Sequence, residues 1–122
     1  MPIYEYGEGM QKWVFIVGSL MIYRNYIHCI EEIGDMLHPE AQGILGLNIS
    51  EMAEKYNNQI FATTQSLEFV QNYLKTVSKE NENLLKDIRI ITLKNIDGKI
   101  RTRVLEGEKA LDLLMNNKME LR

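Results

Sequence analysis

Two short apolar runs, each ending abruptly in polar residues, most constrain how this chain can fold. The first run covers residues 26–30 and precedes two glutamates, and the second covers 59–63 and precedes the polar segment 64–66. Short apolar runs of this kind are typical of strands in a parallel sheet, which is covered on both faces. Parallel strands end at the same edge of a sheet, where α/β proteins bind ligands. We therefore expect the glutamates and segment 64–66 side by side on one rim.

Helical patterns flank and separate the two runs. Apolar residues recur at helical spacing over 10–23, and Pro39 suits the first turn of a helix over 39–55. Ser66 can cap a third helix that ends near residue 77. Two successive α/β units of this kind predict an α/β sheet with flanking helices.

The last third of the chain changes to a pattern typical of strands. Asp97-Gly98 is a strong signal for a hairpin turn between two such strands. A single domain over residues 1–122 is expected, with an antiparallel hairpin at the edge of its sheet. We predict a polar loop over 79–83, hairpin strands over 88–93 and 100–105, and a final helix over 106–116.

Charge and cysteine content limit the classes of partner. The formal net charge is −3, so no global attraction to nucleic acid or anionic lipid is expected. Cys29 is the only cysteine, which excludes an internal disulfide and fits a reducing cytoplasm. Its place inside an apolar run predicts a buried side chain. The acidic first residues are unlike a secretory signal, which also favours a cytoplasmic location.

The apolar stretch 13–23 is too short for a membrane anchor. It has 11 residues, whereas a helix needs about 20 to span a bilayer. We interpret it as a buried helix, and no membrane association is expected.

Several kinds of chemistry are excluded by missing motifs. None of the eight glycines belongs to a G-x-x-x-x-G-K-[S/T] loop, the usual cradle for nucleotide phosphates. With two histidines and one cysteine, no zinc-ligand spacing occurs and no Ser–His–Asp arrangement can be argued. Alone, the chain is therefore not expected to hydrolyse nucleotides.

The remaining motifs, taken in order, resemble the C-terminal half of an ABC-like (AAA-type, P-loop) ATPase domain. Segment 28–39, His-Cys-Ile-Glu-Glu-Ile-Gly-Asp-Met-Leu-His-Pro, is similar to the Walker B strand of that family and the helix start that follows it. Segment 59–66, Gln-Ile-Phe-Ala-Thr-Thr-Gln-Ser, is similar to its switch strand, and segment 6–12 to its signature loop. The resemblance implies a partial P-loop NTPase sheet with flanking helices, a C-terminal β-hairpin and a last helix.

The resemblance also implies catalytic and metal-binding roles. Glu32 matches the catalytic glutamate that orients the attacking water, and Gln65 stands where the family has a switch histidine. A glutamine can donate a hydrogen bond but cannot become a cation. Glu31 stands where an aspartate holds Mg²⁺ through water. Its longer side chain displaces the carboxylate, which octahedral Mg²⁺ sites tolerate poorly.

Nucleotide contacts from a second protomer are implied for another set of residues. In the family, the signature loop presents backbone N–H groups to the γ-phosphate held by the other protomer, and a further loop crosses the dimer interface. The residues that match these two loops are Gly7, Glu8, Gly9 and Asp35.

Three functions remain open. The first is a degenerate ATPase fragment, inactive alone, that acts through association; the changes at Glu31 and Gln65 favour it. The second is the trans-acting half of a split ATPase, which would bind ATP and Mg²⁺ only when a partner supplies the P-loop. The third is a small oligomeric interaction protein without nucleotide chemistry. Each reading predicts a homo-oligomer or a P-loop-containing partner, and none indicates nucleic acid.

Overall fold

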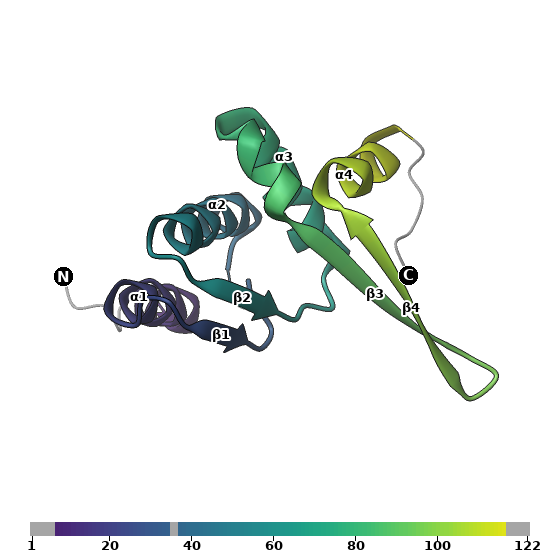
Figure 1. Ribbon diagram of the computed structural model, residues 1–122, viewed down its shortest axis with the longest axis horizontal. Coiled ribbons are helices and arrows are strands. Elements are labelled where there is room, and N and C mark those ends of the chain that lie inside the picture. The colour runs from purple at the N-terminus through teal and green to yellow at the C-terminus, as the bar shows by residue number, and fades with distance from the viewer. Residues whose placement is uncertain (1–6, 35–36, 117–122) are drawn as a thin grey trace.

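Two separate two-stranded sheets and the helices packed beside them form the structure, a computed structural model that describes residues 7–34 and 37–116 (Figure 1). The architecture is mixed α/β, as the sequence predicts, but the hairpin forms a sheet of its own and is not the antiparallel edge of the first sheet that we expected. A hairpin signal in the sequence specifies how its two strands pair with each other and not whether they join another strand. The elements in chain order are α1 (Gly7–Ile22), β1 (Ile27–Ile30), α2 (Pro39–Lys55), β2 (Gln59–Ala62), α3 (Leu67–Glu80), the 3₁₀ helix η2 (Glu82–Asp87), β3 (Arg89–Ile96), β4 (Lys99–Glu106) and α4 (Gly107–Asn116).

The first sheet is parallel, as its two apolar runs predict. Strand β1 pairs with β2 in a register that runs from Ile27 opposite Gln59 to Ile30 opposite Ala62. Side chains alternate between the faces of a strand, so Ile30 and Ile60 point to the face that helices cover. Both pack against a core cluster of Ile16, Leu20, Ile33, Leu45, Ile49 and Phe69.

The other face of this sheet is open, which overturns one expectation. Ile27 and Phe61 are exposed there, and so is Cys29, whose side chain we expected to be buried. The prediction was wrong because an apolar run does not reveal whether a second layer covers the sheet. Among the described residues, no element provides that layer.

Helix α1 is likewise buried on one side only, although stretch 13–23 predicts a buried helix. Ile16 and Leu20 lie in the core, whereas Phe15 and Ile22 are 75% and 74% exposed. The helix also begins earlier than expected, because Gly7–Gly9 form its first turn and not a separate one. Within the described ranges no helix is long and apolar enough to cross a membrane.

The hairpin is longer than its apolar residues indicate. Strands β3 and β4 pair along their whole length, from Arg89 opposite Glu106 to Ile96 opposite Lys99. Asp97 and Gly98 both adopt positive φ, at 52° and 78°, as the tight turns that match strand twist require. Such a two-residue turn keeps the backbone ladder intact up to its ends, so the polar residues next to it are also strand.

A second core cluster joins the hairpin to the helices. It consists of Leu74, Val77, Leu84, Leu85, Ile88, Leu105, Ala110 and Leu114. Burial of Leu84 and Leu85 holds η2 against α3, and α3 itself continues to Glu80. The expected loop over 79–83 is therefore wrong, since most of it is helical. Tyr73 packs against both clusters.

Helices α2 and α3 pack closely around Tyr73. Its hydroxyl is 2.6 Å from the hydroxyl of Ser50 on α2, and its ring stacks on Phe69 with centroids 6.1 Å apart. Burial raises the pKa of the Tyr73 phenol above its ordinary value of 10.0, and the hydrogen bond with Ser50 opposes this shift.

We expect this phenol to make the protein lose stability in alkali. A raised pKa means that the folded state holds the proton more tightly than the unfolded chain. The contribution of the Tyr73 phenol to the free energy of unfolding is fully present below pH 10 and is lost as the pH rises through the raised pKa of the folded state. Urea unfolding between pH 8 and 11 measures this loss. Tyr73→Phe should flatten the alkaline slope, whereas Tyr26→Phe, at an exposed ring, should keep it; equal slopes would contradict the prediction.

Candidate functional site

The segment that follows β1 is held by the end of β2. The backbone N–H of Ile33 donates to the carbonyl oxygen of Thr63 at 2.9 Å, and the N–H of Glu32 donates to the Thr63 hydroxyl at 3.1 Å. Glu32 has a φ of 50°, a left-handed conformation that costs about 1–3 kcal/mol for a residue other than glycine. The two strand ends therefore form one structural unit, with Glu32 at its strained position.

Gly34 fastens the same segment to the helices. Its φ is 83°, and a Cβ atom at this position would lie 2.2 Å from Cδ2 of Phe69. Its carbonyl oxygen accepts a hydrogen bond from the buried amide of Gln42 at 3.4 Å, and the Gln42 oxygen accepts one from Asn72 at 3.2 Å. A chain of contacts thus links the segment after β1 to α2 and α3.

The segment that follows β2 uses its hydroxyls to start α3. The Thr64 hydroxyl accepts from the N–H of Ser66 at 3.0 Å, and the Ser66 hydroxyl accepts from the N–H of Phe69 at 3.0 Å. The second bond confirms Ser66 as the N-cap of α3. The amide of Gln65 makes no hydrogen bond within the described part of the chain, and its side chain is exposed.

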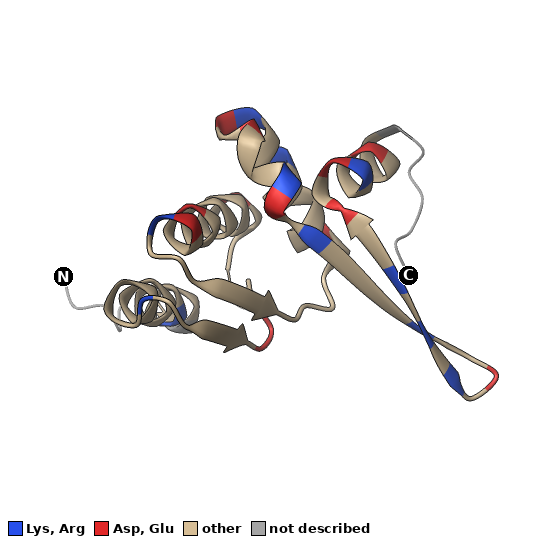
Figure 2. Ribbon diagram, in the orientation of Figure 1, with Lys and Arg blue, Asp and Glu red and all other residues tan. Residues whose placement is uncertain are grey.

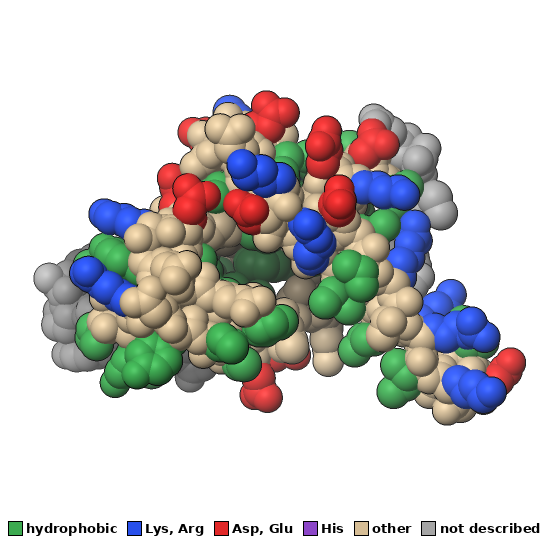
Figure 3. Space-filling model, in the orientation of Figure 1, with side chains coloured by type: hydrophobic (Ala, Val, Ile, Leu, Met, Phe, Trp, Pro, Cys, Tyr) green, Lys and Arg blue, Asp and Glu red, His purple; other side chains and the backbone are tan. Residues whose placement is uncertain are grey.

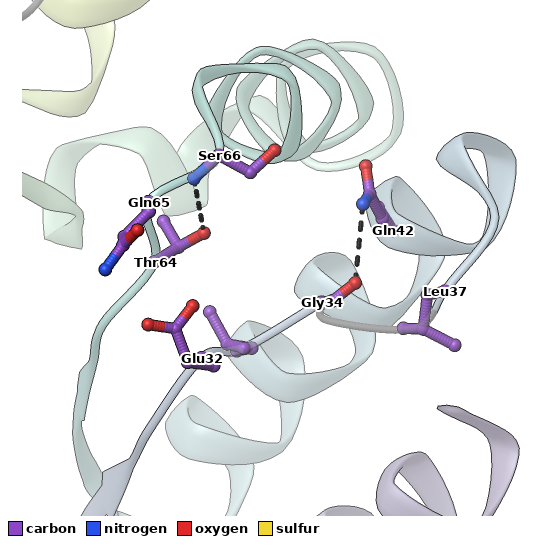
Figure 4. Close-up of a pocket in the computed structure, with 8 residues that line it drawn as sticks. Glu32, Gly34, Leu37, Gln42, Thr64, Gln65 and Ser66 are labelled. Atoms are coloured by element: carbon purple, nitrogen blue, oxygen red, sulfur yellow. Dashed lines mark hydrogen bonds between the residues drawn. The ribbon is translucent and has the colours of Figure 1, made fainter. Parts of the chain in front are cut away.

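The two segments enclose an open polar pocket of about 400 Å³. Figure 4 shows the Glu32 side chain turned toward the segment that carries Thr64 and Gln65. The structure thus brings Glu32 and Gln65 together at the carboxyl ends of two parallel strands, as the sequence predicts. The lining residues are Glu32, Ile33, Gly34, Leu37, Gln42, Thr64, Gln65 and Ser66.

The other predicted site residues whose side chains the structure describes do not line this pocket. Glu31 is exposed beside it, and Gly7 and Gly9 lie in the first turn of α1. The backbone of Glu8 belongs to the same turn, and Asp35 lies outside the described residues.

Lys12 is a feature of the rim that sequence analysis did not single out. Its ammonium group donates to the carbonyl oxygen of Glu31 at 2.8 Å and also to that of Glu32. The Lys12 ammonium group on α1 therefore binds the backbone carbonyl oxygens of both glutamates. One lysine on a helix gives no signal of such a contact in the sequence.

Gln42 was missed as well, although a signal was available. It is a buried polar residue three positions before Leu45 and seven before Ile49, so it interrupts the apolar stripe of α2. Buried polar groups need hydrogen-bond partners, and a glutamine in such a stripe therefore indicates a specific structural contact. Here its amide joins the pocket wall to Asn72.

The side chains that line the pocket supply only part of what nucleotide hydrolysis needs. One carboxylate, that of Glu32, and two carboxamides, those of Gln42 and Gln65, line the pocket, and in the described ranges no three His, Cys, Asp or Glu side chains are grouped to hold a metal ion. Among the described residues, no lysine or glycine-rich loop lines the pocket to receive phosphates. The residues present therefore do not by themselves fit ATP with Mg²⁺.

Comparisons of this chain with protein families, with curated proteins and with solved structures find no match. The pocket and the exposed surfaces of the structure are thus the basis for a functional proposal.

Proposed function

We propose that the chain is a degenerate half of an ABC-like P-loop ATPase domain, inactive in hydrolysis alone, that acts by associating with another polypeptide chain. One observation carries this proposal. The parallel β1–β2 sheet has Glu32 and Gln65 at its carboxyl rim, yet one of its faces has no cover among the described residues.

An open face is unusual for parallel strands. Parallel sheets occur almost only where both faces are covered, whereas here Ile27 and Phe61 are 64% and 50% exposed. Figure 3 shows apolar side chains gathered along the lower edge of the molecule, over α1 and the first sheet. Burying a large apolar side chain contributes about 1.5–3 kcal/mol, so covering this face favours association.

The rim supports descent from a nucleotide-hydrolysing site. A carboxylate on a strained backbone position, as at Glu32, is typical of functional sites. Gln65, which lies beside Glu32, can hydrogen-bond to a phosphate but cannot carry charge. With no P-loop in the chain, ATP and Mg²⁺ would enter only a site completed by another polypeptide. Retention of Glu32 beside Gln65 makes the trans-acting half of a split ATPase the second candidate.

The proposal predicts that Phe61→Lys weakens association. The lysine places a charge on the open face and removes an aromatic ring, which should raise the dissociation constant at least about tenfold, or about 1.4 kcal/mol. Light scattering at micromolar concentration should give a dimer or larger species for the natural chain and a species near 14.2 kDa for the variant. Circular dichroism checks that both are folded.

Met115→Lys is the matched control. Met115 is 49% exposed on α4, and Figure 1 places α4 at the opposite side from α1 and β1. This variant should associate like the natural chain. A folded natural chain that stays monomeric would refute the proposal. Calorimetric titration with ATP and Mg²⁺ should show binding no tighter than about 1 mM, since the phosphate cradle is missing; micromolar binding would contradict it too.

A further inference from the structure

The positive charge of this acidic protein is concentrated on the hairpin. Residues 89–106 contain five basic and two acidic side chains, a net charge of +3, so the rest of the chain carries −6. Figure 2 shows basic residues spaced along β3 and β4 as far as the turn. The overall charge of −3 therefore conceals two regions of opposite sign.

The register of the hairpin sorts these charges onto one face. Lys94 lies directly opposite Arg101, and Arg103 and Lys99 lie opposite Thr92 and Ile96. Cross-strand partners share a face, so Lys94, Lys99, Arg101 and Arg103 form one basic face. The alternate positions carry Ile91, Leu93, Ile100 and Val104. Figure 3 shows apolar side chains along one side of the hairpin and basic side chains along the other.

No anion within the described ranges neutralises the basic face. All four side chains are exposed, and none forms an ion pair or side-chain hydrogen bond with another described residue. Like charges directly opposite each other destabilise a strand pair, and Lys94 and Arg101 are such a pair. Among the described residues nothing offsets this repulsion, which an anionic ligand would relieve.

The shape of the hairpin favours a duplex over a smaller anion. Its strands have eight residues each, which corresponds to a length of roughly 26 Å. Figure 1 shows this ribbon projecting from the helices. The major groove of B-form DNA is about 12 Å wide and admits a two-stranded β-ribbon.

We propose that the basic face of the hairpin binds the phosphate backbone of double-stranded nucleic acid. Contact is limited to the hairpin, because the net charge of −6 on the rest of the chain repels the same phosphates. Recognition is not sequence-specific, since contacts to phosphates carry no sequence information. This proposal does not depend on association through the open face of the first sheet.

Fluorescence anisotropy with a labelled 24-base-pair DNA duplex tests the proposal. Four phosphate contacts give a slope of about −3.6 for log affinity against log salt, or roughly a 100-fold loss between 50 and 200 mM. A variant with all four basic-face residues changed to glutamine should lose this binding and this slope. The matched control removes four exposed charges elsewhere, at Lys75, Lys79, Lys86 and Lys109, and should keep both.

Each of the following results would overturn the proposal. Equal losses in the two variants would indicate a general charge effect, and a slope near zero would exclude phosphate contacts. Tighter binding to a single strand of equal length would exclude a duplex site. Polyglutamate that displaces the duplex at equal charge concentration would indicate an acidic protein partner. Thermal melts of both variants, which change exposed residues only, verify that they are folded.

Discussion

Gly34→Ala is expected to destabilise the protein by about 2–6 kcal/mol, a large part of the stability of a domain this size. Two costs combine at this position. The φ of 83° is a left-handed conformation, in which alanine costs about 1–3 kcal/mol. The new methyl group would also lie 2.2 Å from the Phe69 ring, and overpacking costs about 1–3 kcal/mol. Urea unfolding followed by circular dichroism measures the total.

Gly98→Ala separates these two costs. Gly98 has a similar φ of 78°, but a Cβ atom there would meet nothing within 4 Å. This control should therefore show only the backbone cost. The difference between the variants measures how tightly the segment after β1 is packed against α3. If both variants lose the same free energy of unfolding, the collision with Phe69 is not present in solution.

Gly46→Ala is expected to destabilise the protein by about 1–3 kcal/mol through overpacking. Gly46 is buried where α2 meets α3, and a Cβ atom there would lie 2.3 Å from Cδ1 of Tyr73. The ring cannot move aside freely, because it stacks on Phe69 and its hydroxyl bonds with Ser50. The free energy of unfolding in urea again gives the cost.

Gly18→Ala is the matched control and should have the opposite sign. It is the same change inside a helix, but a Cβ atom at Gly18 would meet nothing within 4 Å. Alanine in a helix interior is favoured over glycine by about 0.5–1 kcal/mol, so this variant should be more stable than the natural chain. If both alanine variants are stabilised, the close α2–α3 contact does not exist.

Both glycine predictions bear on the pocket. Gly34 shapes the segment that carries Glu32, and Gly46 sets how closely α2 and α3 approach behind Gln42. A variant that folds but shifts these contacts would move the carboxylate relative to Gln65. The geometry of the rim therefore depends on packing several residues away from the side chains that face the pocket.

The elements that follow from local rules were predictable from the sequence. Apolar runs ended by polar residues indicate strands β1 and β2, Pro39 and Ser66 mark two helix starts, and Asp97-Gly98 marks the hairpin turn. Parallel pairing then places Glu32 and Gln65 on the same rim, because parallel strands end at one edge. Hydrophobic periodicity, helix capping and turn formation depend on residues that are close together in the sequence, so one sequence is enough to predict them.

Tertiary structure alone decided which surfaces are covered and which side chains reach the rim. Cys29 is exposed because no second layer covers the first sheet among the described residues, the contact from Lys12 spans about 20 residues of sequence, and η2 forms because Leu84 and Leu85 enter a distant core. Such features arise from burial and long-range contact, and local propensity carries no information about either.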